Sequence, residues 1–144
     1  MFLVFIYASL AQAAALAANR ITIQPAPGEV WKLLRMRAIP NVSSTAHASN
    51  YFSYRAYKGD GTGTPIAAAR DTSTGTGSTL TRGTAIEYGP TGDSPTPTLA
   101  FSATGEDLEF TDADPLTIQG AQAASGVLAD LSFMFVFERR RPVS

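Results

Sequence analysis

Short runs of alternating apolar and polar residues recur along this chain between clusters of glycine, proline, serine and threonine. The clearest run covers 127–139, and its alternating residues are Leu131, Ser132, Phe133, Met134, Phe135, Val136, Phe137 and Glu138. Successive side chains of a β-strand point to opposite faces, so this spacing places four large apolar residues on one face of a strand. After residue 20 no stretch shows the apolar period of a helix. The chain is therefore expected to be all-β.

About eight strands are expected after residue 20. They cover 21–24, 29–39, 50–59, 79–88, 97–103, 107–111, 115–119 and 127–139. Segments rich in glycine, proline and threonine separate them, for example 59–65, 71–78 and 89–97. Evenly spaced short strands with such turns indicate an antiparallel β-sandwich, and eight strands with long loops fit a jelly roll. Residues 20–144 are expected to form this sandwich as one domain.

The run 29–39 changes face part-way along its length. Leu34 and Met36 share one face, whereas Trp31 and Leu33 fall on the opposite face. Either a β-bulge near Leu33 and Leu34 or burial of both faces at the start of the strand explains this change. The expected core consists of Trp31, Leu34, Met36, Phe52, Tyr54, Leu99, Phe101, Phe133 and Phe135.

The first nineteen residues carry no charge. Residues 2–7 are aromatic and β-branched, which favours a strand, whereas the alanine-rich residues 8–18 favour a helix. A secretion signal begins with basic residues, which are missing here, although small residues at 11–17 suit its cleavage site. A helix over residues 2–18 would span about 26 Å, short of the roughly 30 Å core of a membrane. We expect residues 1–19 to be an assembly arm, with a secretion signal and a membrane-associated segment as alternatives.

Composition favours association. Charged residues make up only 16% of the chain and hydrophobic residues 44%, so an uncovered surface would be poorly protected against self-association. The candidate interface residues are Phe2, Leu3, Val4, Phe5, Ile6, Tyr7, Leu10, Arg139 and Arg140. The net charge of -1 gives no sign of a nucleic-acid groove. The basic stretch "ERRRP" at 138–142 would meet packaged DNA only on the inward face of a capsid.

No catalytic or metal-binding pattern is visible in the sequence. His47 is the only histidine and there is no cysteine, whereas zinc needs three or four ligands and a general base needs an orienting partner. The acidic run 105–115 lacks the calcium-loop pattern. Its carboxylates alternate with Leu108 and Phe110, as on a half-exposed strand. These carboxylates are Glu106, Asp107, Glu109, Asp112 and Asp114. We therefore expect a protein that is not an enzyme and that uses neither a cofactor nor a metal.

The stretch "LAANRITIQPAPGEVWKLLRMRA" (16–38) resembles the start of small bacteriophage virion proteins. The shared pattern is a small-residue lead, an alternating strand, a proline and glycine turn, and then "GEVW" followed by leucine-rich alternation. The stretch "DPLTIQGAQAASGVLADLSFMFVFE" (114–138) is similar to their ending, where a long aromatic strand closes the chain. The resemblance covers about a third of the 144 residues. It implies a β-sandwich protein of the head-decoration, cement or tail-accessory kind.

These observations predict a structural virion protein, with a capsid decoration or cement protein on the capsid surface favoured. Its partners would be the major capsid protein or other virion subunits, and copies of itself in a homo-oligomer, for which a trimer is favoured. Neither a specific nucleic acid nor a membrane is expected as a partner. The alternatives are a tail, head-tail accessory or minor capsid protein, and a secreted carbohydrate-binding sandwich. The last would use Tyr51, Tyr54, Tyr57 and the acidic run to bind sugar and calcium.

Overall fold

The computed structural model describes residues 2–10, 20–43, 48, 52–67, 70–71, 79–90, 99–102, 105–122 and 131–140. The strands are β1 (Phe2–Leu10), β2 (Arg20–Ile23), β3 (Val30–Pro40), β4 (Phe52–Lys58), β5 (Arg70–Asp71), β6 (Ile86–Gly89), β7 (Leu99–Ala100), β8 (Glu109–Phe110), β9 (Leu116–Gln122) and β10 (Leu131–Arg140). One 3-10 turn, η1 (Gly105–Leu108), is the only helical segment in these ranges. The all-β class predicted from the alternation is confirmed.

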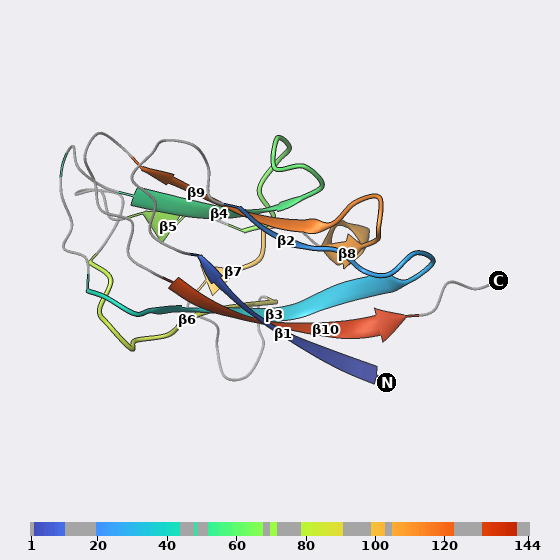
Figure 1. Ribbon diagram of the computed structural model, residues 1–144, viewed down its shortest axis with the longest axis horizontal. Helices are drawn as coiled ribbons and strands as arrows, with labels where there is room; N and C mark the ends of the chain where they lie inside the picture. The colour runs from blue at the N-terminus through green and yellow to red at the C-terminus, as the bar shows by residue number, and fades with distance from the viewer. Residues whose placement is uncertain are drawn as a thin grey trace.

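The strands form two sheets, which lie as two layers in Figure 1. The larger sheet has the order β1-β10-β3-β6-β7, and β8 pairs with a different part of β3. The smaller sheet has the order β2-β9-β4-β5. Among the described strands, every pairing is antiparallel except the short one between β6 and β7. The long strands β10 and β3 therefore form the centre of the larger sheet.

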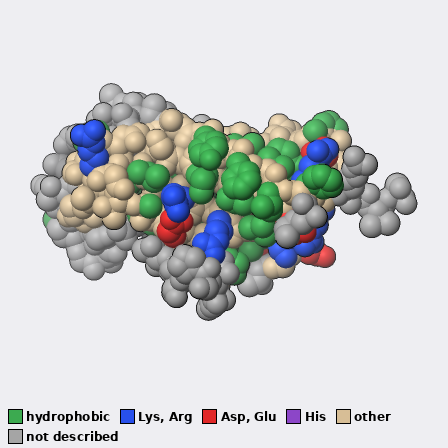
Figure 2. Space-filling view, turned by 90° about the horizontal axis from the view of Figure 1, so that it is seen from below, with side chains coloured by type: hydrophobic (Ala, Val, Ile, Leu, Met, Phe, Trp, Pro, Cys, Tyr) green, Lys and Arg blue, Asp and Glu red, His purple; other side chains and the backbone are tan. Residues whose placement is uncertain are grey.

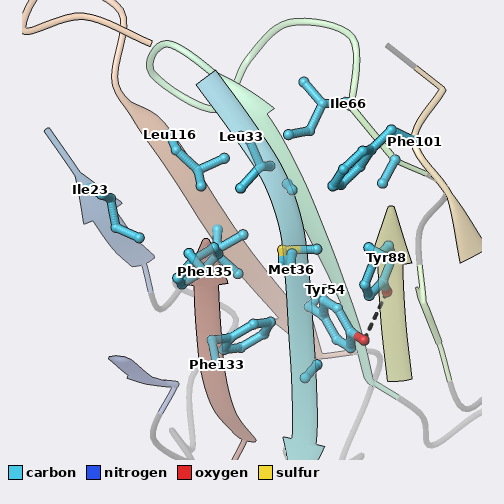
Figure 3. Packing of buried hydrophobic residues seen from close by; sticks show 14 of the residues in the cluster. Ile23, Leu33, Met36, Tyr54, Ile66, Tyr88, Phe101, Leu116, Phe133 and Phe135 are labelled. Carbon is cyan, nitrogen blue, oxygen red and sulfur yellow. Dashed lines mark hydrogen bonds between the residues drawn. The ribbon is translucent and has the colours of Figure 1, made fainter. Parts of the chain in front are cut away.

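The hydrophobic core lies between the two sheets and receives side chains from both of them (Figure 3). The inward residues of β10 are Leu131, Phe133, Phe135 and Phe137, each at most 1% exposed. From the smaller sheet, the Tyr54 ring lies edge-on to Phe133 with ring centroids 5.4 Å apart. The Tyr88 hydroxyl donates a hydrogen bond of 2.8 Å to the Tyr54 hydroxyl across the core. Aromatic packing and this bond together join the two sheets.

A bulge in β3 explains the change of face seen in its sequence. Phe137 of β10 pairs with Leu33, whereas the preceding Val136 pairs with Arg35, so Leu34 is the extra residue. Leu33 is buried and Leu34 is only half-buried. The predicted bulge is confirmed, but the assignment of Leu34 to the core is wrong, because the bulge turns Leu33 inward instead.

Most of the other predicted core residues lie where the alternation placed them. Met36, Tyr54, Phe101, Phe133 and Phe135 are buried. Trp31 and Leu99 are partly buried and pack against the core. The side chain of Phe52 lies outside the described part of the chain.

Several strand boundaries differ from the sequence-based expectation. The expected strand 79–88 is shortened to β6, because a turn at Arg82–Gly83 precedes it and Gly83 adopts a positive φ of 76°. The expected strand 107–111 begins as the 3-10 turn η1 and becomes extended only at β8. Strand β5 was not predicted. A strand of two residues is too short to show an alternating pattern, so it can be identified only from its backbone pairing with a neighbouring strand.

The apolar start of the chain belongs to the larger sheet. Strand β1 pairs with β10 over its whole length, from Phe2 opposite Arg139 to Leu10 opposite Leu131. The strand predicted for residues 2–7 is confirmed, but its partner here is β10 of the same chain rather than a neighbouring subunit. The helix predicted for 8–18 is wrong at Ala8–Leu10, which continue the strand because the buried Leu10 outweighs the helix propensity of alanine. Residues 11–18 lie outside the described ranges, and a domain boundary after residue 19 would separate β1 from its own sheet.

Candidate assembly surface

The outer face of the larger sheet carries a group of apolar residues next to its β1 edge, exposed on β1 and half-buried on β10. We call this group the outer apolar strip; it consists of Leu3, Phe5, Tyr7, Met134 and Val136. Phe5 lies opposite Val136 and Tyr7 lies opposite Met134 in the β1–β10 ladder, so the five residues are neighbours on one face. Figure 2 shows hydrophobic side chains gathered over the middle of this face.

The strip is unusual because β1 is apolar on both of its faces. Val4, Ile6 and Ala8 are turned toward the core and are partly buried. On the opposite face Leu3, Phe5 and Tyr7 are 46%, 53% and 74% exposed. Antiparallel strands with one solvated face normally carry polar residues on it. A contiguous exposed apolar surface of this kind is typical of an interaction site.

Charged residues border the strip on the side of β3. Arg37 lies opposite Met134 and Arg35 lies opposite Val136. The Arg37 guanidinium forms an ion pair of 2.5 Å with Glu87 of β6. The face therefore changes from uncharged at β1 to charged at β3 and β6, as expected for a binding site with an apolar centre and a polar rim.

The nine candidate interface residues divide into groups in the structure. Leu3, Phe5 and Tyr7 are exposed on the strip, and Phe2 is 77% exposed at the start of β1. Leu10 is only 1% exposed and is a core residue, so it is not accessible to a partner. Val4 and Ile6 also pack against the core. Sequence reasoning assigned these three residues to the interface because it did not foresee that β1 would pair with β10.

Arg139 and Arg140 end β10 with ion pairs to the same chain. Arg139 pairs with Glu29, which also accepts a hydrogen bond of 2.8 Å from the indole nitrogen of Trp31. Arg140 bridges Glu109 at 2.7 Å and Glu138 at 3.2 Å. Both arginine side chains are more than 40% exposed, so their charges are partly screened by water. Their contact with a partner remains a prediction.

Met134 and Val136 belong to the strip but were not among the interface candidates predicted from the sequence. They occupy the outward positions of β10. In the sequence they were noted only as the residues that alternate with the inward phenylalanines, and they were not proposed as interface residues. Their apolar character was the available signal, since a solvated outer face would be expected to carry polar residues there. Their position beside Phe5 and Tyr7 depends on the β1–β10 pairing.

A separate cleft of about 540 Å³ is lined in part by Lys58, Ser102, Asp107 and Asp114. The Lys58 ammonium group donates a hydrogen bond of 2.9 Å to the Glu106 carbonyl oxygen. Within the described ranges no three residues of the kinds that bind metals lie close enough to hold an ion. The cleft thus offers a few polar groups without a recognisable catalytic arrangement. His47 lies outside the described residues.

Two of the three tyrosines of the carbohydrate-binding alternative are buried. Tyr54 is 1% exposed and Tyr57 is 8% exposed, so neither ring offers its face to a ligand. Tyr51 lies outside the part of the chain that the structure describes. Stacking against sugars requires exposed aromatic faces, and the exposed aromatic residues of this structure lie on β1 instead.

Comparisons with protein-family models, with curated proteins and with solved structures found no match to this chain. No helix in the described ranges is long and apolar enough to cross a membrane. We therefore infer the function from the residues and geometry of this chain alone.

The acidic run provides a first testable prediction. Leu108 and Phe110 are buried, whereas the acidic residues between and beside them are divided among η1, β8 and the loop after it. Glu109 is already paired with Arg140. We expect that neither millimolar calcium nor a chelator changes the melting temperature, as measured by circular dichroism. An increase in melting temperature with added calcium would show preferential ion binding to the folded chain and contradict this prediction.

Proposed function

We propose that this chain is a structural protein of a bacteriophage particle, in the class of capsid decoration or cement proteins. In this proposal its two sheets form a β-sandwich of the jelly-roll kind, and its outer apolar strip packs against another virion subunit. The observation that carries the proposal is the exposed strip itself, Leu3, Phe5 and Tyr7 beside Met134 and Val136. A stable free surface would be expected to place polar residues on this face.

The composition and layout of the strip are those of a protein-binding site. Its centre is uncharged, and arginines bound it on the side of β3. The aromatic residues Phe5 and Tyr7 supply large contact areas with few rotatable bonds, and aromatic residues are enriched at protein interfaces. Small molecules are normally bound in concave pockets, whereas the strip lies on the face of a sheet. A large, flat protein surface is therefore the partner that fits best.

The experiment that tests the proposal is the recovery of this chain in purified particles. We expect it to band with intact particles in a density gradient and to keep residues 2–10 in intact-mass spectra, because these residues form β1. Electron microscopy of particles with the labelled chain would place it on the head or on the tail. Recovery of the chain only outside particles, with residues 1–13 or 1–17 removed, would contradict the proposal and favour secretion.

Variants of the strip refine this test. Met134→Lys introduces a charge at an outward, half-buried position of β10 and is expected to abolish binding to particles that lack the native chain. Thr84→Lys, at an exposed position in the turn that precedes β6, serves as the matched control. Equal binding of both variants would exclude the strip as the particle-binding surface.

A further inference from the structure

The β1 edge of the larger sheet differs from the other sheet edges. The edge strands β2, β5 and β7 contain four, two and two residues, whereas β1 contains nine. Natural proteins protect long edges with charges, prolines or bulges, because an edge offers unpaired backbone groups to other chains. Strand β1 has no charge, no proline and no register shift against β10. Strand β2 contacts β1 but does not pair with it, so no described strand occupies its outer edge.

We propose that a second copy of this chain occupies this edge. The two β1 strands pair antiparallel about a twofold axis at Phe5, which joins the larger sheets of both copies into one continuous sheet. The inference rests on the proposed function, because the dimer is the form that would present two outer apolar strips side by side to a particle.

The pleat of the sheet restricts the register of this pairing. Outward residues must lie opposite outward residues, since a shift by one position would turn the strip toward the core. A twofold axis at Phe5 places Phe5 opposite Phe5 of the second copy, and Leu3 opposite Tyr7. On the inner face it places Val4 opposite Ile6. All of these pairs are apolar, whereas an axis at Ile6 would place Leu3 opposite the polar Ser9.

The two ends of the β1–β10 ladder differ in charge. Glu138 and Arg139 lie beside Leu3 and Phe2 at one end of the ladder. The opposite end, with Ser9 beside Ser132, is uncharged. An antiparallel pair places the charged end of each copy next to the uncharged end of the other. A parallel pair would instead place both charged ends on the same side of the joined sheet.

The exposed aromatic side chains of β1 supply about half of the area that a stable dimer buries, and the strand edge supplies more. Phe2, Phe5 and Tyr7 are 77%, 53% and 74% exposed. At about 150–250 Å² for each aromatic side chain, they offer on the order of 400 Å² per copy. A stable complex buries roughly 800 Å² per partner. The backbone edge of β1, about 30 Å long at roughly 3.4 Å per residue, supplies hydrogen bonds and further area.

In this proposal the chain forms a twofold dimer instead of the trimer expected from the sequence. Pairing between two copies of the same edge strand uses that edge completely and closes the assembly at two copies. A threefold ring built by sheet extension would need a second free edge of similar length on each copy. The opposite edge of the larger sheet is β7, which contains two residues.

Cysteine pairing provides a direct test, because the chain contains no native cysteine. We expect the purified full-length chain to sediment as a dimer and Phe5→Cys to form a disulfide-linked dimer under mild oxidation. A mixture of Leu3→Cys and Tyr7→Cys chains should form mixed disulfides, whereas Leu3→Cys alone should not. Thr84→Cys, at an exposed position away from β1, is the control and should remain unlinked.

A charge at the twofold axis tests the same contact without cysteine. Phe5→Lys places two ammonium groups face to face, so we expect it to raise the dissociation constant of the dimer by at least about tenfold. Met134→Lys should leave the dimer intact, because Met134 lies one strand away from the edge. A monomeric or trimeric wild-type chain, or a dimer unaffected by Phe5→Lys, would overturn the inference. Particle binding by a monomeric chain would overturn it while leaving the proposed function standing.

Discussion

Replacement of Phe133 or Phe135 by alanine is expected to lower the free energy of unfolding by about 3–5 kcal/mol. Both residues lie on β10, and their side chains are 1% and 0% exposed. Their rings are stacked with centroids 5.8 Å apart, and Phe133 also contacts Tyr54 of the opposite sheet. Removing either ring leaves a cavity in the centre of the core, which a strand paired on both sides has little freedom to close.

Chemical denaturation followed by circular dichroism measures this effect. Met134→Ala is a suitable control, because Met134 lies between the two phenylalanines on the same strand but faces outward and is half-buried. We expect the control to cost less than about 1 kcal/mol, as most surface substitutions do. A loss below about 1 kcal/mol for both phenylalanine variants would mean that the inward face of β10 is not the core.

Deletion of residues 2–10 is expected to prevent stable folding. The sequence alone favours the opposite result, because it assigns residues 1–19 to an assembly arm apart from the sandwich of residues 20–144. The deletion removes Leu10, whose truncation alone would cost about 2–5 kcal/mol when buried. It also removes the partial cover that Val4 and Ile6 give to the core and leaves one edge of β10 unpaired. Because a domain is stable by only about 5–15 kcal/mol, these losses are comparable with its whole stability.

The deletion variant should therefore aggregate or lose its cooperative thermal transition, as followed by light scattering and circular dichroism. The double variant Phe5→Ser and Tyr7→Ser is the matched control, because it changes only outward side chains of the same strand. We expect the control chain to keep a cooperative transition. A deletion variant with the melting temperature of the full chain would show that β1 contributes nothing to folding, and an external partner for residues 2–10 would then be favoured.

Local patterns in the sequence predicted the long strands well. The alternation around Phe133 and Phe135 identified β10 and its inward face, and the change of face near Leu33 indicated the bulge in β3. These features depend on the period of a strand, which each segment carries by itself. Strand β7 lies within the expected strand 97–103, whereas the two-residue strand β5 was not recoverable in this way, because it is defined by its backbone pairing with β4.

The candidate site was only partly predictable for the same reason. The exposed aromatic residues Phe5 and Tyr7 were recognised as interface candidates from their composition. That Leu10 is buried, and that Met134 and Val136 extend the strip, follows from the pairing of residues 2–10 with 131–140. A local sequence pattern does not indicate whether an apolar strand pairs within its own chain or with a strand of another chain.

The pairing of β1 with β10 joins segments from opposite ends of the chain. During translation, β1 emerges well before β10 and lacks this ladder partner until residues 131–140 leave the ribosome. Contacts between such distant segments form slowly. An apolar strand that has not yet paired is prone to aggregation during this time. The outer apolar strip is likewise complete only when both segments are in place. A nascent chain thus lacks the full strip until residues 131–140 have been synthesised, so the strip cannot engage a partner before that point.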